Sequence, residues 1–197
     1  VLFILTIANI SSFIDRQVLA LLVKPIKRDL HLSDTEMSLL MGLSFALFYT
    51  LFGILIGRLA DSKNRTKIIM MGVAMWSVMT SLCAGIGNYF QFFMARMGVG
   101  VGESTLSPSA NSLIADIFPK EKLATATSIF TLGVFLGSGL ATLIGSGILA
   151  KLPTDGMVTL PILGEVFPWQ LIFLYIGLPG FVIALLFLFI KEPERTN

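Results

Sequence analysis

GRLADSKNRTKII, residues 57–69, places five charged residues between two long apolar segments. Hydrophobic residues make up 55% of the 197-residue chain, charged residues make up 13%, and the mean hydropathy is +0.86. Soluble domains carry about twice that share of charge. Because a helix needs about 20 apolar residues to cross a bilayer, we interpret the chain as an all-α membrane protein. Residues 57–69 then contain a polar loop between two spans.

Hydropathy and turn signals predict six membrane-spanning helices with short connections. Ser33 and Glu36 form a capping-box pattern, Gly87 and Asn88 form a turn signal, and Pro119 ends a helix. Residues 151–169 carry three prolines and two glycines, so we expect an external loop with a short hairpin there. We predict spans at about 1–24, 34–60, 66–87, 90–116, 121–150 and 169–190.

The basic residues divide unevenly between the two ends of the predicted bundle. One end carries Arg58, Lys63, Arg65, Lys67, Lys120, Lys122, Lys191 and Arg195, and the other carries Lys24, Lys27, Arg28 and Lys151. The positive-inside rule assigns the more basic end to the cytoplasm. We therefore expect a multi-pass protein of the cell membrane with both ends of this chain in the cytoplasm.

Four ionisable residues interrupt the apolar spans: Asp15 and Arg16 in the first, Arg96 and Glu103 in the fourth. Arg96 and Glu103 share a helix face but stand about 10 Å apart, so each needs a partner elsewhere. A charge at membrane depth costs at least ~2.5 kcal/mol, so such residues pair between helices or face a cavity. We expect the first helix to supply the partners. Two interpretations stay open, a static lock between the helices and a pair of carboxyl groups that exchange protons.

The loop at 57–69 has a second interpretation besides topology. Gly57 and Asp61 lie one helical turn apart, so the glycine admits a neighbouring helix and the carboxylate can accept from the amides of another helix N-terminus. The stretch resembles the loop signature Gly-x-x-x-Asp-Arg-x-Gly-Arg-Arg of the major facilitator superfamily, between its second and third helices. Ser62 and Asn64 depart from that signature.

The fourth predicted helix carries a second signature. RMGVGVGESTLSP, residues 96–108, resembles a motif of the same superfamily through Arg96, Gly100, Gly102 and Pro108, and Asp-Ile-Phe-Pro follows at 116–119 as it does there. From the residues alone, we expect the glycines to allow close helix packing and Pro108 to kink the helix. The two signatures together predict a releasable clamp at the cytoplasmic end, formed by Gly57, Asp61, Arg65, Lys67 and Asp116.

Three longer stretches resemble the spinster-like branch of this superfamily, from its bacterial side. They are FIDRQVLALLVKPIKRDLHLSD, GLSFALFYTLFGILIGRLAD and ARMGVGVGESTLSPSANSLIADIFPKEKLATATSIFTLGVFLGS. The resemblance implies proton-linked export or flipping of lysolipids and sphingolipid phosphates. It also implies that Asp15 and Glu103 sense protons beside Arg96. We assign the substrate cavity to Arg16, Arg96 and Tyr49.

The resemblance implies a transporter of twelve helices in two halves, each built from two inverted three-helix repeats around a midplane substrate site. This chain supplies one half. We expect residues 1–190 to form the N-terminal six-helix bundle and 191–197 to begin the central cytoplasmic linker. The expected partners are protons, a small-molecule or lipid substrate, membrane lipid and the missing C-terminal six-helix half.

Three classes of function remain. The first is transport of amphipathic anions such as lysolipids, and the second is proton symport of small organic or sugar acids, because Arg96 can hold a carboxylate. The third is a scaffold or an intramembrane enzyme, which is disfavoured because one histidine and one cysteine leave little for metal or thiol chemistry. We expect no cofactor, no metal site and no catalysis. A formal charge of +2 does not suggest a nucleic-acid partner.

Overall fold

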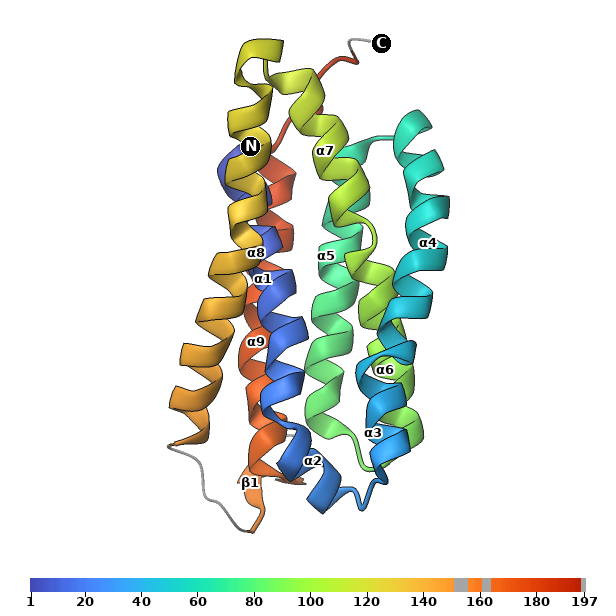
Figure 1. Cartoon of the computed structure of the whole chain (residues 1–197), viewed down its shortest axis with the longest axis vertical. Helices are drawn as coiled ribbons and strands as arrows, with labels where there is room; N and C mark the ends of the chain where they lie inside the picture. Colours follow the sequence, from blue (N-terminus) through green and yellow to red (C-terminus); the bar gives the residue numbers. More distant parts are fainter. Residues whose placement is uncertain (151–155, 161–163, 196–197) are drawn as a thin grey trace.

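The computed structural model describes residues 1–150, 156–160 and 164–195, in which long helices run side by side along one axis (Figure 1). Both chain ends lie at one end of this bundle, and α2 with the hairpin lies at the other. The helices are α1 Leu2–Leu21, α2 Val23–Asp29, α3 Asp34–Met41, α4 Leu43–Ser62, α5 Arg65–Leu82, α6 Tyr89–Glu103, α7 Leu106–Ile117, α8 Lys120–Leu149 and α9 Pro168–Leu186. Two short 3₁₀ helices, η1 Cys83–Gly85 and η2 Phe187–Phe189, follow α5 and α9.

The predicted spans match the helices closely. Five helical segments of the described chain are long and apolar enough to cross a membrane: Leu2–Leu21, Asp34–Ser62, Arg65–Gly85, Lys120–Ile148 and Pro168–Phe189. The remaining predicted span, 90–116, is also helical, but it is divided into α6 and α7. The six-span bundle is therefore present, with the spans predicted at 34–60 and 90–116 each made of two helices.

The predicted helix ends are confirmed where they rest on a local chemical cause. Ser33 and Glu36 form the capping box at the start of α3, with a bond in each direction between side chain and backbone. Asn88 caps α6 by accepting from the amide of Gln91. Pro119 separates α7 from α8. The short hairpin expected in the external loop is also present, with strands β1 Val158–Leu160 and β2 Gly164–Val166 antiparallel.

Two interruptions inside the predicted spans were not expected at these positions. Gly42 separates α3 from α4. Ser104 and Thr105 separate α6 from α7, just before the proline that was expected to kink this span. Pro108 occupies the first turn of α7, and it has no N–H to bond the carbonyl of Ser104 one turn earlier. The helix therefore restarts here.

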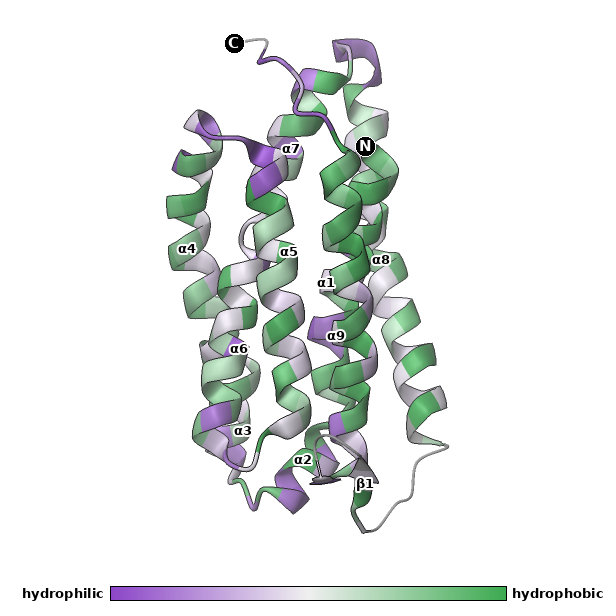
Figure 2. Ribbon diagram, turned by 180° about the vertical axis from the view of Figure 1, so that it is seen from behind, coloured by the Kyte–Doolittle hydropathy of each residue, from purple (hydrophilic) through white to green (hydrophobic). Residues whose placement is uncertain are grey.

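Polar residues gather at both ends of the bundle, while its middle is mostly hydrophobic (Figure 2). Large apolar side chains remain exposed along the outside, including Phe135 on α8, 72% exposed, and Val182 on α9, 60% exposed. A hydrocarbon environment suits such side chains. Inside the bundle, α1 packs mainly on α8 and α9, whereas α6 packs mainly on α4 and α5. A broad contact between α5 and α9 joins these two groups of helices.

Small residues allow the closest helix contacts, as expected for the glycine-rich spans. A Cβ atom on Gly102 of α6 would lie 2.8 Å from the carbonyl oxygen of Gly72 on α5. A Cβ on Gly137 of α8 would lie 2.6 Å from the carbonyl oxygen of Ile10 on α1. The backbones approach so closely that only the hydrogen atom of a glycine fits at these two positions.

Replacing Gly102 with alanine is therefore expected to lower the free energy of unfolding by about 1–3 kcal/mol, because the new methyl group meets backbone that cannot move aside. A Cβ on Gly139 of α8 would meet no atom within 4 Å. Gly139→Ala should be neutral or stabilise by about 0.5–1 kcal/mol through better helix propensity. Thermal unfolding of the detergent-purified full-length protein compares the two variants, and equal melting temperatures would contradict the packing argument.

Candidate functional site

Two ion pairs connect α1 to α6 in the interior of the bundle. Arg96 Nη1 donates to Asp15 Oδ1 at 2.6 Å, and both side chains are 2% exposed. Arg16 Nε donates to Glu103 Oε2 at 2.6 Å, with side chains 26% and 0% exposed. The acid of each helix thus pairs with the base of the other, which satisfies all four charges in place.

The spacing along each helix explains this crossed arrangement. Asp15 and Arg16 are adjacent on α1, so their side chains point in different directions from the helix axis and end at different heights along the bundle. Arg96 and Glu103 are seven residues apart, close to two turns, so they lie on one face of α6 at two levels. One pair therefore forms at each level. The sequence correctly predicted that the first helix supplies the partners.

Two hydroxyl groups also donate to these carboxylates. Ser12 Oγ, one turn before Arg16, donates to Glu103 Oε2 at 2.6 Å. Thr80 of α5 donates to Asp15 Oδ2. Sequence reasoning missed both residues. The position of Ser12 on the charged face of the first helix was a usable signal, whereas Thr80 is brought in by tertiary packing that no local pattern reveals.

Aromatic rings surround the guanidinium of Arg16. Its Cζ lies 4.9 Å from the ring centroid of Phe13, 4.6 Å from that of Phe45 and 4.7 Å from that of Tyr49. A cation over ring faces at such distances is attracted by their quadrupoles. Arg96 Cζ lies 5.7 Å from the Phe45 ring. The three residues predicted to line a substrate cavity, Arg16, Arg96 and Tyr49, thus surround a common ring.

Two buried polar atoms at this centre have no hydrogen-bond partner among the described residues: Arg96 Nε and Glu103 Oε1. An unsatisfied buried group of this kind costs about 1–3 kcal/mol, and native structures usually satisfy it. The carboxylate oxygen retains capacity to accept, and the guanidinium retains capacity to donate. A proton can therefore add to Glu103 Oε1 without first breaking an existing hydrogen bond.

A second cluster lies at the end of the bundle that holds both termini. Arg65, 1% exposed, forms an ion pair with Asp116 of α7. Its Nε donates to Glu192 Oε1 at 2.8 Å, and its Nη1 donates to Ser112 Oγ at 2.9 Å. The start of α5 is thereby joined to α7 and to the segment that follows η2.

Two charged side chains hold residues 190–195 against this end of the bundle. Glu192 Oε2 accepts from the amide of Thr66 at 2.9 Å and from its hydroxyl at 2.8 Å, at the N-terminus of α5. Arg195 Nη2 donates to the carbonyls of Ala60 and Lys63, at 2.8 and 2.7 Å. Partial burial raises the pKa of Glu192, but hydrogen bonds from Arg65 and Thr66 outweigh it, so the pKa lies below its ordinary value.

The predicted clamp residues are only partly brought together. Arg65 and Asp116 meet, but Asp61 and Lys67 are exposed, and their charged groups have no partner within the described part of the chain. A Cβ on Gly57 would meet nothing within 4 Å. No atom of the described chain packs against Gly57, so the expectation that it admits a neighbouring helix stays a prediction for a helix outside this chain. Sequence reasoning also missed Glu192, because the polar stretch after the last span predicted only a linker.

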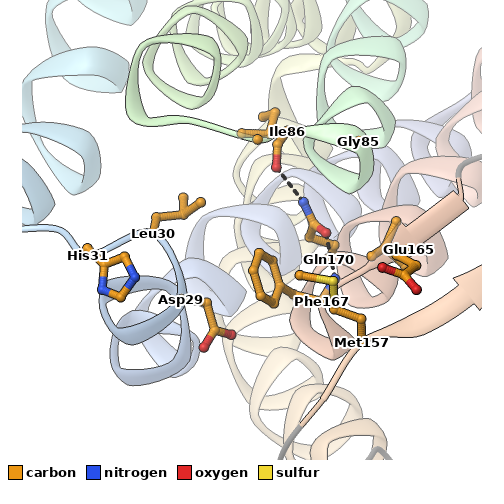
Figure 3. A pocket seen from close by; sticks show the side chains of 11 residues that line it. Asp29, Leu30, His31, Gly85, Ile86, Met157, Glu165, Phe167 and Gln170 are labelled. Atoms are coloured by element: carbon orange, nitrogen blue, oxygen red, sulfur yellow. Dashed lines mark hydrogen bonds between the residues drawn. The ribbon is translucent and has the colours of Figure 1, made fainter.

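The opposite end holds a pocket of about 430 Å³ between α2, η1 and the hairpin (Figure 3). Asp29, His31 and Glu165 are among its lining residues. Gln170 Nε2 donates to the carbonyl of Ile86 at 2.6 Å, one of the bonds drawn in Figure 3. Trp169 Nε1 donates to Asp29 Oδ2 at 3.1 Å. These bonds fasten α9 to α2 and to the residue after η1 at the far end, away from the ion pairs between α1 and α6.

Comparison with known proteins agrees with this architecture. The family model of the Major Facilitator Superfamily matches residues 5–197. The crystal structure of a bacterial homolog to the human lysosomal transporter spinster, inward-facing and unoccupied, superposes with a TM-score of 0.89 at 35% identity, covering 100% of this chain and 43% of that one.

Two curated relatives show the same partial coverage. Protein spinster homolog 1 of Xenopus tropicalis is 32% identical over 148 residues, which are 74% of this chain and 28% of that protein. The hexuronate transporter of Bacillus subtilis is 28% identical over 198 residues, or 100% of this chain and 43% of that protein. The chain therefore spans less than half the length of these relatives and corresponds to their N-terminal portion. It belongs to the major facilitator superfamily, and its relatives include the spinster proteins.

Proposed function

We propose that this chain is the N-terminal half of a proton-coupled secondary transporter that moves amphipathic anions, such as lysolipids or sphingolipid phosphates, by alternating access. The observation that supports this most strongly is the crossed pairing of Asp15 with Arg96 and of Arg16 with Glu103. Four ionisable groups within apolar spans are functional groups by default, because a purely structural contact does not require charge there.

Protonation of either carboxyl removes the negative charge that holds its guanidinium. The pairs join α1, which packs on α8 and α9, to α6, which packs on α4 and α5. Loss of an ion pair on protonation weakens the connection between these two sets of helices. Glu103 Oε1 has no hydrogen-bond partner among the described residues, so a proton can add there directly. Proton binding is thereby coupled to the relative position of the helices.

Arg16 is the group best placed to bind the anionic part of a substrate. Its side chain is 26% exposed, while Arg96 is 2% exposed. The rings of Phe13, Phe45 and Tyr49 beside it offer apolar surface to the rest of an amphipathic molecule. Similarity to a sphingosine-1-phosphate transporter of Danio rerio, 31% identical over 145 residues, supports a lipid phosphate as the substrate.

A second candidate is proton symport of small organic or sugar acids. A hexuronate transporter matches the whole of this chain, and a guanidinium binds a carboxylate as readily as a phosphate. The two candidates share the proton-coupled ion pairs and differ in the length of the apolar part that the substrate presents to the aromatic rings.

The end that carries both termini is proposed to face the cytoplasm, since most of the basic residues outside the spans lie there. We assign the Arg65, Asp116 and Glu192 cluster to a cytoplasmic clamp. The exposed carboxylate of Asp61 and the open face at Gly57 are available to a second six-helix half. Membrane lipid, protons and that second half are the expected partners.

Neutralising the carboxyl groups tests the proton-coupling role. Asp15→Asn and Glu103→Gln, in full-length protein reconstituted into proteoliposomes, should bring the ratio of transport rates with and without a pH gradient to about one. Glu121→Gln, which removes an exposed carboxylate at the start of α8, should retain the wild-type ratio. A wild-type ratio in both site variants would leave these carboxyl groups with the role of a static lock.

Asp15→Asn also leaves Arg96 buried without a counter-charge, which destabilises a fold by about 3–5 kcal/mol. The double variant Asp15→Asn with Arg96→Gln removes the pair together and separates lost folding from lost coupling. Each preparation is tested with labelled lysolipid and with labelled hexuronate. Uptake of hexuronate alone would replace the lipid proposal with the acid symporter.

The cytoplasmic cluster gives a pH-dependent prediction. Because Glu192 has a lowered pKa in the folded protein, its ionised form stabilises the docked segment above the ordinary value, and this stabilisation is lost as the pH falls through the lowered value. The protection factor of the Thr66 amide, which compares its hydrogen exchange with the intrinsic rate at the same pH, should therefore stay high from about pH 7 to about pH 5 and fall only at more acidic pH.

At neutral pH, Glu192→Gln should lower the hydrogen-exchange protection of the Thr66 amide by about tenfold, since charge-assisted hydrogen bonds contribute about 1.5–3 kcal/mol. Glu194→Gln changes an exposed neighbour and serves as the matched control. Equal protection of the Thr66 amide in the two variants would show that Glu192 does not hold the segment.

A further inference from the structure

The ring of Phe45 lies beside both guanidinium groups of the two ion pairs. Its centroid is 4.6 Å from Arg16 Cζ and 5.7 Å from Arg96 Cζ. Phe13 and Tyr49 also face Arg16, at 4.9 and 4.7 Å. Phe45 is thus the ring that faces both bases among the cation–π contacts of the described chain. Each arginine in turn forms an ion pair with one carboxylate. The ring of Phe45 is therefore connected to each acid through one guanidinium group.

The ring is carried by a helix that contains neither ion pair. Phe45 lies in the first turn of α4, three residues after the break at Gly42 that separates α3 from α4. Its ring stacks on Tyr49 one turn later, at 5.4 Å between centroids. The position of α4 therefore sets the position of the ring, while α1 and α6 set the positions of the charges.

A close backbone contact fixes Phe45 against α6. A Cβ on Gly100 would lie 2.7 Å from the carbonyl oxygen of Phe45, closer than real Cβ contacts occur. Gly100 lies four residues after Arg96, one turn along the same helix. Any displacement of α4 along or away from α6 therefore moves the ring relative to Arg96, and relative to Arg16 at the same time.

We propose that Phe45 is a positioning residue that couples the two ion pairs, so that a shift of α4 loosens both guanidinium groups together. This inference rests on the proposed proton-coupled transport. The attraction between ring and cation is strongest in a desolvated setting, which the buried pair of Asp15 and Arg96 provides. Phe45 itself binds no proton; it determines how firmly the bases neutralise the acids.

The titratable and charged groups that form the two pairs or face them contribute to any pH profile. They are Asp15 and Arg16 on α1, Tyr49 on α4, Cys83 in η1, and Arg96 and Glu103 on α6. A change at Phe45 leaves all six in place. A shift in the pH profile of a Phe45 variant then results from a change in the positions of these groups, because none of them has been removed.

The test is the pH dependence of transport by the full-length protein in proteoliposomes. Phe45→Leu keeps an apolar side chain but removes the ring, so the fixed positive charge that keeps the carboxylates ionised is held less firmly. The pH of half-maximal transport should rise by about 0.5–1 unit. Phe45→Tyr keeps the ring and should restore the wild-type midpoint.

Matched variants separate positioning from general packing. Phe48→Leu alters a neighbouring ring on α4 that stacks on Phe52 at 6.4 Å, and its midpoint should match the wild type. Gly100→Ala pushes the Phe45 carbonyl away and should shift the midpoint in the same direction as Phe45→Leu. Gly98→Ala meets only the flexible Met79 side chain and should not. The Gly100 variant keeps the test decisive where Phe45→Leu fails to fold.

The outcomes separate the inference from the function on which it rests. A wild-type protein whose transport does not depend on pH overturns the proposed function and this inference with it. A pH-dependent wild type whose midpoint is unmoved in Phe45→Leu and in Gly100→Ala overturns the inference alone. An equal shift in Phe48→Leu also overturns it, because the effect would then belong to α4 packing in general.

Discussion

The requirement that four charges inside an apolar bundle neutralise one another is the constraint on which the other features depend. Removing one member would leave its partner buried and uncompensated, at a cost of about 3–5 kcal/mol. Because α1 and α6 pack mainly on other helices, the long arginine and glutamate side chains carry much of the connection between them. Ser12 and Thr80 then follow as donors that each carboxylate needs when it is withdrawn from water.

Close packing elsewhere in the bundle complements these polar contacts. Backbones of α5 and α6 approach through Gly72 and Gly102, and α5 meets α9 through Gly177, where a Cβ would lie 2.8 Å from the Ser81 amide. Such contacts are not easily deformed, because interdigitated helices resist small displacements. Ion pairs join α1 to α6, whereas close backbone contacts at glycines bring α5 against α6 and α9. In the proposed mechanism the ion pairs respond to protons and the glycine contacts do not.

The sequence predicted the features that have local causes. Long apolar runs define the spans, and the Ser33 capping box and Pro119 end helices through chemistry within a few residues. The crossed ion pairs were partly predictable, because two acids and two bases in two apolar spans must compensate. Thr80, Phe45 and Glu192 were not predicted, since their roles arise from segments that meet only in the folded chain. The break at Gly42 was missed because one glycine inside an apolar run is compatible with an uninterrupted helix.

The segment at 190–195 joins two helix ends of opposite polarity. Glu192 lies at the amide end of α5 and Arg195 lies at the carbonyl end of α4, so each charge meets the dipole end of opposite sign. Only Lys63 and Asn64 connect these two helices. If α4 tilted away from α5, Arg195 would have to move with it or lose its hydrogen bond to the carbonyl of Ala60. Arg195 is thus tethered to the C-terminal end of α4, so the anchoring of residues 190–195 depends on the orientation of that helix.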